Sequence, residues 1–395
     1  MKPEVKPADS PIARLFGFGL TRMQATGMGL LFAFFCFVPI ALLADKSADV
    51  AVPFTRDYAM LARVLVALPL VVAFSPHLQG LIDEALDHAP KSNIVTGADT
   101  TTYERWVHLV RQLRASRIAE LLFVAMAFAS GFTNQQIPGV LAGLHGWGYS
   151  AAGELNLAGQ WYVHVVLPLF RLMVLIWIWR LLMWTLFLGS LSFLKLNLNP
   201  AHPDGAADLG YLGFVQQRLS IALAIGSLML AGSAANRIAY LGEHLGDHLF
   251  PLLGFILLYP ALLLAPLILT CPLLLRTKRN GVFEYSLIGD GMAAQFRRDW
   301  IDNPGDAGDR LASPNPSAMA DFTMMHSVVQ EMSILPIRSW AVISMFVAAA
   351  GPLLLLVLLE VPLDALLRSA LSELPPLDLV ATYSQPFPQA PPGTG

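Results

Sequence analysis

Three side chains that can bind a cation or exchange a proton lie close together in the segment 199–213: His202, Asp204 and Asp208. Imidazole and carboxylate groups are both ligands for divalent metals, so this spacing predicts a cation or proton site. A structural interpretation competes with it, because Pro203 fixes φ and Asp204 can cap the helix that follows. We expect the segment to be a cytoplasmic loop between two membrane spans.

A second polar group combines two acids and two histidines: Glu243, His244, Asp247 and His248. In a helix the two imidazoles would share one face a turn apart, and together with a carboxylate they would be adequate zinc ligands. The alternative is a solvated turn around Gly246. The segment therefore predicts either a metal site or a polar loop on the outer side.

Two arginines lie inside an apolar stretch, where ionisable side chains are costly and often functional. Arg171 lies nearer its outer boundary, and Arg180 lies nearer its inner boundary among tryptophans. Glu120 is a candidate partner for Arg180. These arginines indicate either passage of an anion or proton, or a structural role through pairing and snorkelling.

Prolines interrupt another apolar stretch, at Pro260 and Pro266 among others. Each interior proline frees a backbone carbonyl, which at membrane depth must face protein, water or an ion. Broken helices of this kind line many transport sites, although kinks also serve packing alone.

The sequence contains no phosphate-binding loop, dinucleotide fingerprint or haem attachment site, and we find no catalytic signature. The net charge is −3, so no general basic field attracts nucleic acid. The two cysteines, Cys36 and Cys271, both lie in apolar stretches and form neither a disulfide framework nor a cysteine zinc site. We expect no enzyme activity, no cofactor and no nucleic-acid partner.

The elements that position these residues are membrane spans. Of 395 residues, 55% are hydrophobic and only 13% are charged, about half the charge of an ordinary soluble domain. The apolar residues form blocks long enough to cross a bilayer. We therefore predict an all-α, polytopic membrane protein in the lipid bilayer with seven transmembrane helices, near 26–44, 58–76, 118–132, 165–190, 216–235, 249–275 and 340–360.

Basic residues set the predicted orientation. Seventeen lysines and arginines fall in the N-terminal segment and the second, fourth and sixth loops, whereas the opposite side has four. This imbalance places the N-terminus in the cytoplasm and the C-terminus outside.

The predicted organisation has three parts. Residues 1–25 form a cytoplasmic N-terminal segment, residues 26–374 form the transmembrane domain, and the proline-rich tail 375–395 is disordered. Cytoplasmic loops at 77–117 and 276–339 contain helices, and apolar periodicity places these at 77–90, at 101–117 running straight into the third span, and near 283–300 and 317–334.

Two runs carry a resemblance, PLFRLMVLIWIWRLLMW at 168–184 and LKLNLNPAHPDGAADLGYLGF at 194–214. The chain resembles a family of bacterial multi-spanning inner-membrane proteins in which an arginine- and tryptophan-rich helix precedes an HPD…LGFL-type loop. Tyr285, Trp300 and Pro336 fit the later part of that pattern. The resemblance implies a bacterial inner-membrane location and carries no implied activity.

Two functions remain open from the sequence. The first is a channel or transporter for a small ion or solute, based on the prolines and the intramembrane arginines. The second is a non-transporting scaffold or sensor that docks a protein partner on its cytoplasmic helices. Transport predicts a hydrated cavity that reaches Arg171 or Arg180, whereas a scaffold predicts a dry bundle and exposed apolar side chains on the cytoplasmic helices.

Overall fold

The computed structural model describes residues 11–47, 50–97, 99–133, 146–150, 152–302 and 315–360, and within them it is helical with no strand. The predicted tail 375–395 and the C-terminus lie outside the described residues. The helices are α1 (Pro11–Leu15), α2 (Arg22–Leu43), α3 (Tyr58–Leu61), α4 (Leu68–Lys91), α5 (Asp99–Arg114), α6 (Arg117–Thr133), α7 (Leu157–Trp161), α8 (Leu167–Leu191), α9 (Gly210–Arg218), α10 (Ile221–Leu241), α11 (Leu249–Ile268), α12 (Cys271–Arg297), α14 (Asn315–Glu331), α15 (Ser339–Ala350) and α16 (Leu354–Glu360).

Six helical runs in the described chain are long and apolar enough to cross a membrane, so the protein is a multi-pass membrane protein. They are Arg22–Leu43, Tyr58–Lys91, Leu157–Leu191, Gly210–Leu241, Leu245–Ile268 and Ser339–Val357. The predicted span at 118–132 corresponds to α6, which has 17 residues and is not among the six. At 1.5 Å per residue α6 measures about 26 Å, slightly less than a typical hydrocarbon core.

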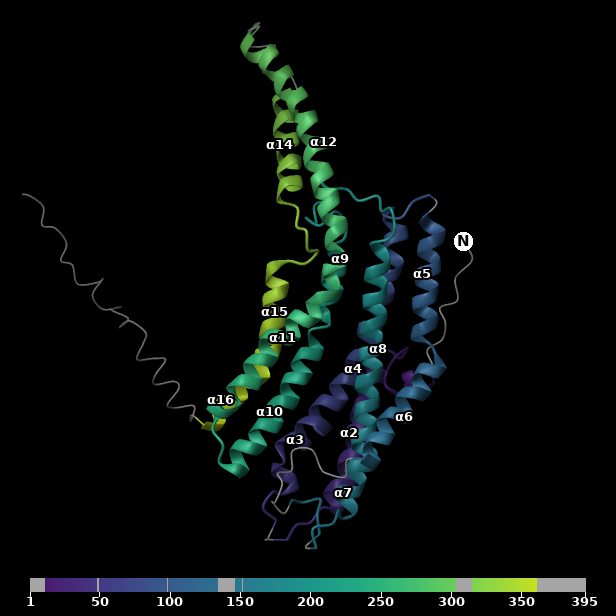
Figure 1. The fold of residues 1–395 in the computed structure, drawn as a ribbon, viewed down its shortest axis with the longest axis vertical. Helices are drawn as coiled ribbons and strands as arrows, with labels where there is room; N and C mark the ends of the chain where they lie inside the picture. The colour runs from purple at the N-terminus through teal and green to yellow at the C-terminus, as the bar shows by residue number, and fades with distance from the viewer. Residues whose placement is uncertain are drawn as a thin grey trace, which may run out of the picture.

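The spans form a long bundle from which α12 and α14 project at one end (Figure 1). We call α12 and α14 the arm, the end of the bundle next to it the arm end, and the opposite end the far end. The arm is a pair of helices that pack on each other, with the Tyr285 and Phe322 rings stacked 6.2 Å apart. The described helices at 271–297 and 315–331 take the place of those predicted near 283–300 and 317–334.

Three predicted boundaries differ from the structure. The helix predicted at 77–90 continues the second span without a break, because Pro76 and Pro90 are both accommodated within α4. The helix at 101–117 does not run straight into α6, because the chain turns at 115–116 and the Ser116 hydroxyl accepts from the Ala119 N–H. The stretch 249–275 is likewise two helices, since α12 starts afresh with Pro272 in its first turn.

The N-terminal segment contributes to the core. Thr21 and Gln24 form a capping box that starts α2, and the turn before it buries Phe16 and Phe18 completely. Gly17 adopts a positive φ of 91° there, and a Cβ at this position would lie 2.5 Å from the Val72 carbonyl oxygen. The residues before the first span therefore pack against α4 and are part of the helical bundle.

Candidate functional site

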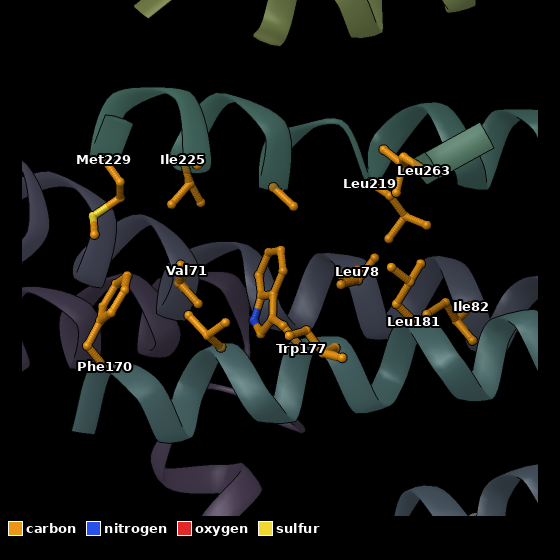
Figure 2. Close-up of a pocket in the computed structure, with 14 residues that line it drawn as sticks. Val71, Leu78, Ile82, Phe170, Trp177, Leu181, Leu219, Ile225, Met229 and Leu263 are labelled. Atoms are coloured by element: carbon orange, nitrogen blue, oxygen red, sulfur yellow. The ribbon is translucent and has the colours of Figure 1, made fainter. Parts of the chain in front are cut away.

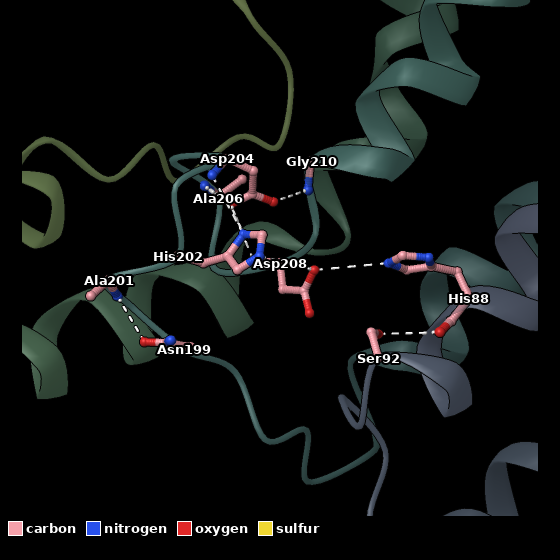
Figure 3. Close-up of polar contacts among 9 residues, drawn as sticks. All are labelled: His88, Ser92, Asn199, Ala201, His202, Asp204, Ala206, Asp208 and Gly210. Atoms are coloured by element: carbon pink, nitrogen blue, oxygen red, sulfur yellow. Dashed lines mark hydrogen bonds and ion pairs between the residues drawn. The ribbon is translucent and has the colours of Figure 1, made fainter.

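The loop between α8 and α9 brings together the three residues that the sequence singles out (Figure 3). His202 Nδ1 lies 2.9 Å from Asp204 Oδ1, and His202 Nε2 lies 3.6 Å from Asp208 Oδ1. One ligand atom from each of the three residues lies within 4.8 Å of the other two, so the three groups are close enough together to contact a single cation. The side chains are partly buried, with 34% of His202 and 22% of each carboxylate exposed.

Asp204 organises the backbone of this loop. Its Oδ1 accepts the N–H groups of Ala206 and Asp208 at 2.9 and 3.2 Å, and its Oδ2 accepts the Gly210 N–H at 2.8 Å. Burial opposes ionisation of Asp204, but these three donors and His202 outweigh it and lower the pKa of the carboxyl. The capping role predicted as the structural alternative is therefore real, because Gly210 begins α9.

Three residues of the loop have left-handed backbone conformations: Gly205 with φ 70°, Ala207 with φ 53° and Asp208 with φ 71°. This conformation is unfavourable for Ala207 and Asp208, because their Cβ atoms crowd the backbone. The Asp204 hydrogen bonds on either side of Ala207 hold the chain in this path. The result is that Asp208 turns back toward His202.

The structure adds a fourth residue that the sequence did not indicate. His88, near the end of α4, has its Nε2 3.8 Å from Asp208 Oδ1, and its ring lies 4.3 Å from the Tyr211 ring. Asp208 thus has an imidazole on each side, one from the loop and one from a membrane-spanning helix. His88 belongs to a segment predicted as helical, but no local pattern connects it with a loop 114 residues later in the chain.

The chemistry of the donor set suggests how a cation would bind. Asp204 Oδ1 is already occupied by two backbone N–H groups and His202, so Asp204 orients the imidazole and is a poor ligand itself. A carboxylate that accepts from one ring nitrogen leaves the other nitrogen free for a metal, as is common around metal-bound histidine. His202 Nε2 and Asp208 Oδ1, which lie 3.6 Å apart, would then be the two ligands that the loop supplies.

A cavity of about 600 Å³, lined by both polar and apolar side chains, adjoins Asp204 and lies between the loop and the base of the arm. Its lining includes Asp204, Gln217, Glu331 and Arg338. The arm is tied to the loop beside this cavity, because the Ser333 N–H donates to the Gly205 carbonyl at 2.8 Å. The cluster therefore lies where loop, spans and arm meet.

Close backbone contacts reinforce this junction. A Cβ at Gly213 would overlap the Pro336 carbonyl oxygen, and one at Gly281 would lie 2.6 Å from Pro200 Cβ. Lys278 Nζ donates to the Met332 carbonyl at 2.8 Å. Gly213 consequently allows the segment after the arm to approach α9, and Gly281 allows the arm itself to approach the loop at Pro200.

The polar group at the far end is arranged differently from the predicted zinc site. Both Glu243 oxygens accept from Arg237, at 2.8 and 2.5 Å, and His248 Nε2 lies 2.9 Å from Oε2. The hydrogen bond from Arg237 lowers the pKa of Glu243. His244 and Asp247 instead cap the short 3₁₀ turn Leu245–His248, so the two histidines do not share an α-helical face.

The intramembrane arginines occupy different environments on α8. Arg180 is buried, with its guanidinium 3.6 Å from the centre of the Phe18 ring, whereas Arg171 is half-buried nearer the far end. Glu120 is buried on α6, and its pairing with Arg180 stays a prediction. The sequence does not predict that the Arg180 guanidinium stacks on Phe18, since it predicts that the N-terminal segment lies outside the bundle.

Pro260 and Pro266 are both buried inside α11, which continues through them.

A buried polar network at the far end was missed by sequence reasoning. Arg63 donates to the Tyr162 hydroxyl, and each residue lies in a π-helical segment, Ala62–Ala67 and Tyr162–Val166. Asp57 accepts from Trp147 Nε1 and Asn236 Nδ2, both at 2.9 Å, and is fully buried. Segments of π-helix are often found at functional sites, but no sequence pattern predicts where they occur.

Comparisons with protein-family models, with curated proteins and with solved structures give no match. The resemblance noted from the sequence therefore remains a proposal.

Proposed function

We propose that this protein is a membrane scaffold or sensor that docks a soluble protein partner on its arm. The observation that supports this most is an apolar stripe on α12, in which Phe283 and Leu287 are 64% and 73% exposed. They lie four residues apart and so share one face of the helix. Hydrophobic grooves of partner proteins recognise a helix through apolar side chains of this kind, spaced one turn apart on one face.

The interior of the bundle favours docking over conduction. A cavity of about 240 Å³ between α4, α8, α10 and α11 is lined by apolar side chains, and its described lining includes neither Arg171 nor Arg180 (Figure 2). A path for ions requires polar groups that replace the hydration shell. This cavity therefore matches the dry interior expected of a scaffold.

The proposal includes a seven-span topology in the bacterial inner membrane, with the N-terminus in the cytoplasm and the C-terminus outside. The end of α4 lies at the arm end, where Asn197 donates to the Ile94 carbonyl, whereas the turn before α7 lies at the far end, where Trp147 donates to Asp57. The chain between them passes along α6, which packs on α8 (Figure 1). This path supports α6 as the seventh crossing, and the excess of basic residues on the arm side supports a cytoplasmic arm.

Photo-crosslinking in intact cells tests the docking proposal. A photoreactive residue at position 283 or 287 of the full chain should capture a soluble protein. Glu284 and Gln295 are exposed at other angles on the same helix and serve as matched control positions. Equal capture at all four positions, or capture of lipid alone, would contradict a specific docking face.

A second candidate, transport of a small ion or solute, is favoured by the far-end network. The Arg63–Tyr162 pair and Asp57 place charge within the bundle, and the π-helical segments that carry the pair are places where a helix can rearrange. Ion flux in proteoliposomes, with chloride, potassium and proton gradients tested separately, examines this alternative. Flux that changes in Arg171→Ala or Arg180→Ala would favour transport, and absence of flux from folded protein would favour the scaffold.

A further inference from the structure

The apolar cavity inside the bundle is an elongated groove within the membrane-spanning region (Figure 2). Four membrane-spanning runs supply its wall, which includes Val71 and Ile82 on α4, Phe170 and Trp177 on α8, Met229 on α10 and Leu263 on α11. Along α8 the lining extends from Phe170 to Leu181, a rise of about 16 Å. The groove is therefore long compared with its volume of about 240 Å³.

The polar atoms at the groove are satisfied by the protein. Trp177 Nε1 donates to the Ser75 hydroxyl at 3.0 Å, and that hydroxyl donates to the Val71 carbonyl at 2.7 Å. The indole face is left to line the groove, while its N–H points into α4. Because the indole N–H and the Ser75 hydroxyl are already hydrogen-bonded to each other and to Val71, they offer no partner to a polar solute. Burying a polar solute in the groove would therefore cost free energy.

The groove opens toward the bilayer. Two of its lining residues, Ile178 on α8 and Ala222 on α10, are exposed on the surface of the bundle, while Val71, Leu78 and Leu219 behind them are buried. Because these helices span the membrane, the medium at the opening is lipid. An empty apolar groove would forgo dispersion contacts that a hydrocarbon chain restores.

We propose that this groove binds the hydrocarbon chain of a bilayer lipid, which lies along α8 against the face of Trp177. The inference does not depend on the docking function of the arm, because none of the residues involved belongs to the arm.

Quenching of Trp177 by brominated acyl chains tests the proposal. The full chain is reconstituted in nanodiscs of phosphatidylcholine whose chains are either plain or brominated, and the Trp177 signal is the difference between wild type and Trp177→Phe. We expect several-fold quenching of that signal in brominated lipid. Filling the mouth of the groove by Ala222→Phe should abolish most of this quenching.

Matched variants keep the test decisive. Leu257→Phe enlarges an exposed residue of α11 that does not line the groove, so it should leave the quenching unchanged. Ala222→Leu serves if Ala222→Phe does not fold, and it should reduce the quenching partly. Equal quenching in wild type and both Ala222 variants would overturn the proposal, as would quenching of Trp177 by aqueous iodide, which would show that the groove holds water.

Discussion

Removal of the Asp204 carboxylate is the sharpest perturbation of the loop at the arm end. In Asp204→Ala, three backbone N–H groups lose their acceptor: those of Ala206, Asp208 and Gly210. An unsatisfied buried donor costs about 1–3 kcal/mol, and the lower value applies here because water reaches this partly exposed loop. Three donors then cost about 3 kcal/mol in the free energy of local opening, which corresponds to about 100-fold in the opening equilibrium.

Hydrogen–deuterium exchange on peptides covering 199–210, with the protein in lipid nanodiscs, measures this opening directly. We expect the three amides to exchange about 100-fold faster in Asp204→Ala than in wild type. Asp204→Asn keeps one carbonyl oxygen for Ala206 and Asp208 but none for Gly210, so it loses one acceptor contact worth about 1 kcal/mol, and its effect should be intermediate, at about fivefold.

The control is Asp290→Ala, which removes an exposed carboxylate from α12 and should leave exchange in the loop unchanged. Exchange in Asp204→Ala within twofold of wild type would refute the reasoning that this carboxylate holds the left-handed path of the loop.

Three further predictions concern the same junction. Because the folded pKa of Asp204 is lowered, its stabilising effect is complete above the ordinary aspartate pKa of about 3.9 and is lost as pH falls through the folded pKa. Loop exchange corrected for its intrinsic pH dependence should therefore be constant from neutral pH down to about 4 and rise below that, and the rise should be absent in Asp204→Asn. Gly213→Ala forces a Cβ against the Pro336 carbonyl and should destabilise the junction by about 1–3 kcal/mol, seen as faster proteolysis at 331–338, whereas unchanged proteolysis would contradict the contact. If His202 and Asp208 bind a cation, zinc should slow exchange at 199–210 in wild type and not in His202→Ala, and equal slowing in both would place the metal elsewhere.

The membrane character of the fold could be predicted because hydrophobic blocks are a local property of the sequence. Five of the predicted spans correspond to five of the six membrane-spanning runs. The remaining run, Leu245–Ile268, corresponds to the span predicted at 249–275, but it ends earlier at its C-terminal end. The shortening depends on Thr270, whose hydroxyl donates to the Leu267 carbonyl in a buried turn. That contact competes with continued helix, and hydropathy alone does not contain it.

The site could be predicted only in part, for a similar reason. His202, Asp204 and Asp208 lie close in sequence, so their proximity in space followed from a single loop. His88 reaches Asp208 only through packing of α4 against α9, which no short-range pattern encodes. The roles within the cluster do not follow from residue types either, because only the hydrogen bonds that Asp204 accepts distinguish a residue that orients the imidazole from one that binds a cation.

The Arg180–Phe18 contact illustrates how tertiary packing changes the interpretation of a charge. An arginine within a span indicates function when its surroundings are unknown. Here the buried ring of Phe18, from a segment expected to be cytoplasmic, lies against the guanidinium. The structural interpretation of Arg180 gains support from this contact.

The binding of the captured soluble partner to the full chain in nanodiscs tests the central proposal most directly. Burial of a leucine side chain contributes about 1.5–3 kcal/mol, so Leu287→Ser should weaken the affinity between about tenfold and 100-fold. Glu284→Ser, on the adjacent face of the same helix, should leave the affinity unchanged. Equal affinity for wild type and Leu287→Ser would contradict docking on the apolar stripe of the arm.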